Sequence, residues 1–240
     1  MVKRFMVICL ALVLLLMTAG LAPAEIISYV INPDDYFTER DLSGKWVEAE
    51  AIEKTLTESL TITEEGVYVL SGEIANGTVT VNVTSDEKVQ LVLNGVSISC
   101  ASGPCIYVQN ADKVFITLTE GTESILTSTG FTEGEEADGA VFSKDDIVFN
   151  GKGSMSITSA KHGIAGNDDV KFCGGTYIIH AQERGINAKD SVRIFDGSFT
   201  VYSGKTPIRA KNKKNAEKGY VLILGGSFYL HTDSAEAAED

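Results

Sequence analysis

The sequence predicts an all-β fold, a parallel β-helix or solenoid whose coils are about 22 residues long. From about Leu56 onward, short alternating runs of β-branched and apolar residues are separated by Gly, Asn and Asp, and no helical period is present. The segment "HGIAGNDDVKFCGGTYII" (162–179) also returns 22 residues later as "RGINAKDSVRIFDGSFTV" (184–201). Each copy holds about three short strands, which cannot enclose a core alone, so the copies must stack.

Further copies lie on both sides of this pair. Upstream are "AVFSKDDIVFNGKGSMSI" (140–157) and the poorer "CIYVQNADKVFITL" (105–118), and downstream "YVLILGGSFYL" (220–230) follows the insertion "KNKKNAEKG" (211–219). Stacking would place equivalent residues ~4.8 Å apart. The inward columns are then Ile147, Val170, Val192, Val221; Phe149, Phe172, Ile194, Ile223; and Met155, Tyr177, Phe199, Phe228. A β-sandwich is the alternative, but its strands rarely repeat at a fixed period.

The first 24 residues have the pattern of a secretory signal peptide, which predicts a secreted, extracellular protein. Lys3 and Arg4 precede an apolar run at 5–17, and "APA" (22–24) offers small residues for cleavage. A retained membrane anchor is the alternative, although the run is shorter than the ~20 residues that span a bilayer. Residues 25–55 then form an N-terminal segment or cap, 56–232 the repeat domain, and 233–240 an acidic tail.

Charge excludes one class of partner. Without residues 1–24, which hold two of the 20 basic residues, the chain has 18 basic and 33 acidic residues, a net charge of 18 − 33 = −15. Nucleic-acid binding is not expected, because its affinity depends on Lys and Arg at phosphates. The same charge repels an acidic substrate unless a cation stands between them.

Two cysteines lie close together in "SCASGPC", at Cys100 and Cys105. In an exported protein this pair could close a small disulfide loop, and two free buried thiols are the alternative.

Aspartates return at one place in each copy. In stacked coils they would form a ladder of carboxylates, and neighbours ~4.8 Å apart repel by about 1 kcal/mol in water and about 3.5 kcal/mol at a dielectric constant near 20. Calcium would relieve this repulsion, because it takes six to eight oxygen ligands. Turn residues that cap local N–H groups, neutralised by nearby lysines, are the alternative. The ladder consists of Asp112, Asp145, Asp168 and Asp190, with Asp146 and Asp169 beside two of them.

Five segments together resemble the family of secreted bacterial carbohydrate-binding β-helix proteins first recognised in a cellulolytic clostridium. They are "FTERDLSG" (37–44), "VQLVLNGVSI" (89–98), "ADKVFITLTEGTES" (111–124), "FSKDDIVFNGKGSMSIT" (142–158) and "HGIAGNDDVKFCGGTY" (162–177). The resemblance covers roughly residues 37–229. It implies a right-handed parallel β-helix, bound calcium, and adhesion to acidic plant cell-wall polysaccharide such as polygalacturonate (pectin), with cellulose as a second ligand. It also implies a shape akin to calcium-dependent pectate lyases.

Calcium would then bridge protein carboxylates to sugar carboxylates. The family tends to place an acidic residue before the "GI" of each coil, and Asp138 keeps it, whereas later coils read "KHGI", "ERGI" and "KTPI". The predicted metal ligands are therefore Asp112, Asp138, Asp145, Asp146, Asp168, Asp169 and Asp190.

These observations favour a calcium-dependent carbohydrate-binding protein without catalytic activity. A pectate lyase is one alternative, for which Lys144 and Lys189 are the only plausible bases, but a neighbouring aspartate favours the protonated lysine. A structural or adhesive surface protein without sugar specificity is another. The predicted ligand-binding residues are Lys144 and Lys189, with Tyr202 and Tyr229 as outward-facing rings.

Overall fold

The computed structural model describes residues 31–233, which fold almost entirely as β-strands. The described residues from Asn32 onward belong to one compact unit. They begin with three short helices, η1 (Pro33–Asp35), α1 (Glu39–Ser43) and η2 (Glu48–Glu50). None of the described helices has the length and apolar character needed to cross a membrane. The predicted signal peptide lies outside the described residues.

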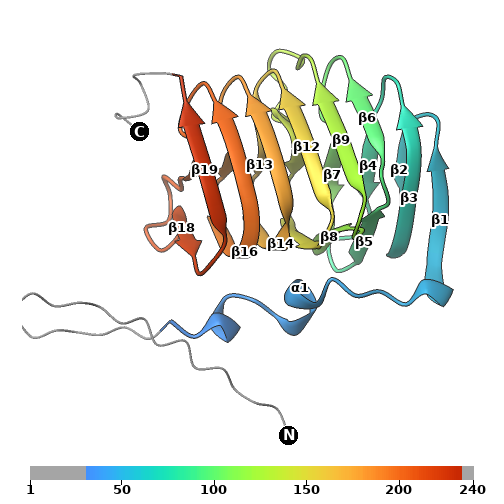
Figure 1. Ribbon diagram of the computed structural model, residues 1–240, viewed down its shortest axis with the longest axis horizontal. Coiled ribbons are helices and arrows are strands. Elements are labelled where there is room, and N and C mark those ends of the chain that lie inside the picture. Colours follow the sequence, from blue (N-terminus) through green and yellow to red (C-terminus); the bar gives the residue numbers. More distant parts are fainter. Residues whose placement is uncertain (1–30, 234–240) are drawn as a thin grey trace, which may run out of the picture. The chain divides into compact units, whose positions relative to one another are not determined.

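The larger sheet has twelve strands, and every pairing in it is parallel. Figure 1 shows β3, β6, β9, β12, β14, β16 and β19 side by side in sequence order. The strands are β1 (Ala51–Leu56), β3 (Gly66–Ile74), β5 (Lys88–Leu93), β6 (Ser97–Cys100), β8 (Lys113–Leu118), β9 (Glu123–Ser128), β11 (Asp146–Gly151), β12 (Ser154–Ser159), β14 (Asp169–Ala181), β16 (Ser191–Ser203), β18 (Tyr220–Ile223) and β19 (Ser227–Thr232).

A second sheet of seven parallel strands completes the fold. Its order is β17-β15-β13-β10-β7-β4-β2, so each strand lies beside the equivalent strand of the next repeat. The strands are β2 (Leu60–Ile62), β4 (Val79–Asn82), β7 (Ile106–Asn110), β10 (Gly139–Ser143), β13 (His162–Gly166), β15 (Ile186–Ala188) and β17 (Ile208–Ala210).

The predicted fold class requires a correction, because the larger sheet closes on itself. β3 pairs with both β5 and β6, and β14 pairs with both β11 and β12. Hydrogen-bonded pairs therefore run around a ring of eight parallel strands, β3-β5-β8-β11-β14-β12-β9-β6. The structure is all-β with a closed eight-stranded parallel β-barrel, so the predicted right-handed parallel β-helix, an open solenoid, is wrong.

Strand length explains the difference. The sequence predicted strands of three to five residues, broken at the glycine-containing turns, whereas β14 runs for 13 residues. Gly174 and Gly175 adopt φ values of 155° and 89°, the second of which an L-residue rarely adopts. β14 thus changes direction without ending, and its two halves pair with β11 and β12.

The repeat does predict the register of the core. Val170 lies beside Val192 and Phe172 beside Ile194, 22 residues apart, as expected from the sequence. Aromatic residues stack along the inward columns, with ring centroids 5.0 Å apart for Tyr177 and Phe199. These columns fill the interior and fix which residues face outward.

The N-terminal segment lies across the outer surface of β8, β11 and β14. Asp41 of α1 is fully buried, and its carboxylate lies 3.2 Å from Lys171 Nζ and 3.8 Å from Lys113 Nζ. Thr38 and Asp41 form a reciprocal capping box at the start of α1. The Asn150 side chain donates to the Asp41 carbonyl at 3.1 Å, so the segment is anchored by charge and by hydrogen bonds.

Cys100 and Cys105 are free thiols in this structure, and both are buried. The Cys105 thiol donates to the Ile98 carbonyl at 3.3 Å. Burial, with a smaller contribution from Cys100, raises the pKa of Cys105 to about 12. The small-loop disulfide is therefore not formed, and the alternative of free buried thiols holds.

Candidate functional site

The structure brings most of the predicted aspartate ladder together. Asp146 and Asp169 are neighbours in adjacent strands, because Ile147 pairs with Val170, and the Asp169 N–H donates to Asp146 at 3.3 Å. Each of the other four aspartates directly precedes a strand of the larger sheet: Asp112 precedes β8, Asp145 β11, Asp168 β14 and Asp190 β16. Asp138 is the exception, because it lies in the segment before β10, at the seven-stranded sheet.

Basic side chains accompany these carboxylates. Asp112 pairs with Lys88 at 2.5 Å, Asp146 with Lys113 at 3.6 Å, and Asp169 with Arg193 at 2.8 Å. Asp190 pairs with Lys218, and Asp145 accepts the Ala111 N–H at 3.0 Å. No group of three or more His, Cys, Asp or Glu side chains within residues 31–233 is arranged to hold a metal ion.

These carboxylates, as they lie, do not fit a calcium ion. Calcium takes six to eight oxygens, whereas each of these side chains already binds a protein cation or an N–H group. A calcium ion would have to displace lysine or arginine. The metal-binding role of the ladder stays a prediction, and no step of the proposed function depends on it.

Two members of the ladder, Asp168 and Asp190, are hydrogen-bonded to each other through their side chains. Burial, followed by the hydrogen bond with Asp190, raises the pKa of Asp168 to about 7. Burial also raises the pKa of Asp190, but hydrogen bonds with Asp168, Lys218 and Asn212 outweigh it and lower the net value. When Asp168 is protonated it donates to the ionised Asp190, and this form of the pair carries one negative charge fewer.

Asp190 also anchors the insertion at 211–219. Asn212 Nδ2 donates to Asp190 Oδ1 at 2.6 Å, and Lys218 forms an ion pair with the other oxygen. The Asn212 side-chain oxygen accepts the N–H groups of Lys214 and Asn215, both at 2.9 Å. One aspartate of the ladder therefore fixes the conformation of the most lysine-rich segment of the chain.

This insertion borders a groove of about 420 Å³ over the seven-stranded sheet. Its floor is a column of outward residues from consecutive repeats: Phe142 pairs with Ala165, Ala165 with Asn187, and Asn187 with Arg209. Tyr107 extends the column beyond Phe142, with the two rings in an edge-to-face contact at 5.8 Å. The small Ala165 side chain leaves the floor hollow at its middle.

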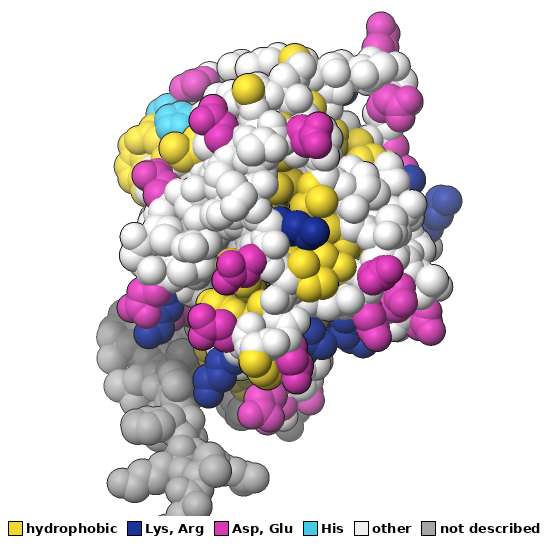
Figure 2. All heavy atoms as spheres, turned by 90° about the vertical axis from the view of Figure 1, so that its right-hand side faces the viewer, with side chains coloured by type: hydrophobic (Ala, Val, Ile, Leu, Met, Phe, Trp, Pro, Cys, Tyr) yellow, Lys and Arg dark blue, Asp and Glu magenta, His cyan; other side chains and the backbone are white. Residues whose placement is uncertain are grey.

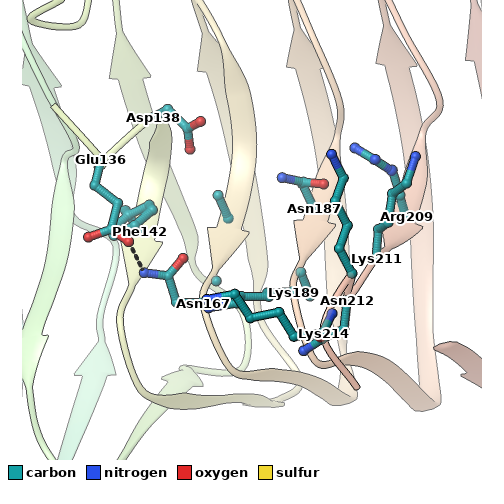
Figure 3. Close-up of a pocket in the computed structure, with 14 residues that line it drawn as sticks. Glu136, Asp138, Phe142, Asn167, Asn187, Lys189, Arg209, Lys211, Asn212 and Lys214 are labelled. Carbon is teal, nitrogen blue, oxygen red and sulfur yellow. Dashed lines mark hydrogen bonds between the residues drawn. The ribbon is translucent and has the colours of Figure 1, made fainter. Parts of the chain in front are cut away.

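The walls of the groove carry opposite charges at its two ends. Figure 3 shows Lys189, Arg209, Lys211 and Lys214 around one half, and Glu136 and Asp138 at the other. Lys213 also lines the groove. Among the described residues, no acidic side chain pairs with Lys189, Lys211, Lys213 or Lys214. The groove is therefore a cationic site on a strongly acidic protein.

The four predicted ligand-binding residues lie at two separate places. Lys189 lines this groove, and Lys144 lines a neighbouring hollow that Lys189 and Asp168 share. Tyr202 and Tyr229 lie on β16 and β19 of the larger sheet, with ring centroids 5.7 Å apart. Tyr202 stacks face to face on His180 at 4.7 Å, so that face of its ring is occupied and is not open to a sugar.

His162 is buried beside the acidic end of the groove. Its Nε2 lies 3.7 Å from both Asp138 and Glu183, and its Nδ1 accepts the Arg184 N–H at 3.1 Å. Burial lowers the pKa of His162 to about 4, although Glu183 acts in the opposite direction. The neutral ring is the form that this site holds.

We expect His162 to make the protein less stable in acid. Its pKa is lower in the folded state than the ordinary 6.5, so this contribution is complete above pH 6.5 and is lost as the pH falls toward 4. From about pH 7 to about pH 5, the loss in unfolding free energy is about 2 kcal/mol. Urea unfolding at both pH values measures it, and His162→Asn is the control, because Asn can still accept the Arg184 N–H. Equal losses in both proteins would contradict this assignment.

The sequence indicated the acidic ladder but not the groove. The groove's signal is "KNKK" at 211–214, a rare basic run in an acidic chain. Its floor gave no signal, because Phe142, Ala165, Asn187 and Arg209 share no residue type.

Known proteins resemble this chain in sequence and in structure. The sequence profile of one family, described as "Carbohydrate-binding domain-containing protein", matches residues 57–239. A protein of the same description from Acetivibrio thermocellus is 32% identical over 126 residues, which cover 50% of this chain and 44% of that protein. The chain thus spans less than half of that relative. A solved structure of a "polysaccharide lyase-like protein from C. thermocellum", a gadolinium derivative, matches with a TM-score of 0.71 and 27% identity, over 75% of this chain and 81% of the other.

Proposed function

Because this chain belongs to the family of carbohydrate-binding domain-containing proteins, we propose that it binds an acidic plant cell-wall polysaccharide, such as polygalacturonate, in the groove over β10, β13, β15 and β17. The observation that carries the proposal is the set of lysines there that have no acidic partner among the described residues. Polygalacturonate presents one carboxylate on each sugar, and such a polymer could meet several of these lysines at once.

The overall negative charge does not prevent this binding. At physiological ionic strength, charges farther apart than about 8 Å are largely screened, so the residues of the groove determine the local field. Five basic side chains and two acidic ones line the groove, so its local charge is positive. The basic residues are Lys189, Arg209, Lys211, Lys213 and Lys214, and the acidic residues are Glu136 and Asp138. Figure 2 shows many acidic side chains on the end of the protein that carries β1, which contrasts with this groove.

The floor suits a sugar ring as well as a carboxylate. The Asn187 side chain, which lines the groove, offers a donor and an acceptor, and the buried Phe142 and Ala165 form the apolar base beneath. The floor column crosses consecutive strands, which lie ~4.8 Å apart, so a polymer along it would meet a new residue at each strand.

Two finer points belong to the proposal. The groove's lysines supply the positive charge for binding, so retention is proposed to be independent of the predicted calcium. Binding without cleavage is the proposed activity, and a lyase is the alternative because the similar structure is named polysaccharide lyase-like. The predicted secretion would bring the chain to an extracellular polymer.

Affinity electrophoresis in gels that contain polygalacturonate tests the proposal, first with calcium and then with a chelator. We expect the protein to migrate more slowly in both of these gels. In a gel that contains a neutral galactan, its migration should not be slowed. Slower migration only in the gel with calcium would show that binding needs a bridging calcium ion. The metal content of the purified protein would then show which ion it holds. Normal migration in every gel would contradict the proposal, and release of unsaturated uronate would identify a lyase.

A further inference from the structure

Within residues 31–233, the inward columns of the core are uncovered at the end of the fold formed by β17, β18 and β19. Val221 and Ile223 of β18 are 41% and 47% exposed, whereas Val192 and Ile194, their partners in β16, are fully buried. All four belong to the same two inward columns, so the exposed side chains are core residues that lack a covering layer.

The adjoining strand β19 shows the same feature. Phe228 continues the stack of Tyr177 and Phe199, with its ring 5.1 Å from that of Phe199, but it is only half-buried. Leu230 is 45% exposed, whereas its partner Val201 is fully buried. Together, Val221, Ile223, Phe228 and Leu230 form an apolar surface, which we call the β18–β19 surface.

The backbone of this end is also unpaired on one side. Within the described residues, β17, β18 and β19 each pair with one strand only, β15 for the first and β16 for the other two. The stretches at 220–224 and 227–230 contain no charged residue and no proline. Proteins usually protect a free strand edge with charges or proline, and an unprotected apolar edge can pair with another chain.

The opposite end of the fold, at β1, carries charged residues. β1 carries Glu53 and Lys54, and the core residues Leu56 and Ile62 are buried there. Figure 2, which faces this end, shows charged side chains among the apolar ones. Ile52 of β1 is 40% exposed at this end, but Glu53 and Lys54 place charges on the same strand, whereas among the described residues the edge at β18 and β19 is uncharged over 220–224 and 227–230.

We propose that the β18–β19 surface binds the same surface of a second copy of this chain, in a two-fold symmetric dimer. Self-association through one patch requires that the patch complement itself. Apolar side chains meet this requirement, and so do the charges beside them. The basic insertion at 211–219 precedes β18, whereas the acidic Asp233 directly follows β19, so a two-fold axis can place opposite charges together.

A second copy brings the same large apolar side chains, Phe228, Ile223 and Leu230, to this surface. Because Lys211 and Lys214 of the groove belong to the insertion next to this surface, the dimer would also bring two grooves close together.

Sedimentation equilibrium of the full chain at micromolar concentration tests the dimer. We expect twice the chain mass for the wild type and a single chain mass for Ile223→Lys combined with Leu230→Lys. The control is Ile52→Lys combined with Ile125→Lys, which alters two similarly exposed side chains elsewhere and should leave the dimer intact. Circular dichroism confirms that each variant is folded.

A monomeric wild type would overturn the inference, as would a dimer that survives in the β18–β19 variant or dissociates in the control. The mass does not depend on polysaccharide binding, so failure of this inference and failure of the proposed function are separate results.

Discussion

Reversal of two groove charges, Lys189→Glu together with Lys211→Glu, should abolish retention by polygalacturonate. The two lysines lie in consecutive repeats on the same wall of the groove. Each substitution removes an attraction and adds a repulsion, together worth about 1–2 kcal/mol per site, so the pair should weaken binding about 100-fold. Affinity electrophoresis at several polymer concentrations gives the ratio of dissociation constants.

A control with the same change of net charge separates the groove from the protein as a whole. Lys54→Glu combined with Lys152→Glu alters two lysines outside the groove, of which Lys152 is highly exposed and pairs only loosely with Glu120. Retention should fall less than three-fold in this variant, because distant charges are screened. If both variants lose retention equally, net charge controls binding and the groove is not the site.

Removal of the buried carboxylate, Asp41→Ala, should lower the free energy of unfolding by about 3 kcal/mol. The substitution leaves Lys171 buried without its partner, and loss of one member of a buried ion pair costs about 3–5 kcal/mol. It also removes the acceptor for the Thr38 N–H in the capping box. Urea unfolding followed by circular dichroism measures the change.

Asp112→Ala is the matched control, because Asp112 also pairs with a lysine but at the surface. Exposed pairs contribute about 0–1 kcal/mol, so this variant should be nearly as stable as the wild type. A second substitution, Lys171→Met with Asp41→Ala, should recover part of the loss, because no unpaired charge then remains. An Asp41→Ala protein as stable as the control would show that the buried pair does not anchor the N-terminal segment.

The sequence predicted the residues that stack but not how the sheet closes. Val170 and Val192 occupy equivalent positions of two repeats that are 22 residues apart. They lie side by side because stacked repeats pair position by position. Closure depends on whether a strand stops at a glycine pair or bends through it. Gly174 and Gly175 are compatible with both, and only the contacts of β14 with β11 and β12 decide the outcome.

The candidate site was partly predictable for a related reason. Aspartates at one position of each repeat are visible in the sequence, and so are basic residues near them, such as Lys113 and Arg193, but the sequence does not show which of these pair. Lys88 reaches Asp112 from 24 residues away, and Lys218 reaches Asp190 from 28. Four aspartates of the ladder, Asp112, Asp146, Asp169 and Asp190, are paired with lysine or arginine in this structure, and the behaviour of the ladder with added metal stays a prediction.

The floor of the groove takes one residue from each of β10, β13, β15 and β17. Insertion or loss of a whole repeat would therefore lengthen or shorten the floor by one position without disturbing its neighbours. A change in the number of repeats would therefore change how many sugar units of a bound polymer can contact the floor. Substitution of Ala165 or Asn187 would change the side chain that a sugar unit meets at that position.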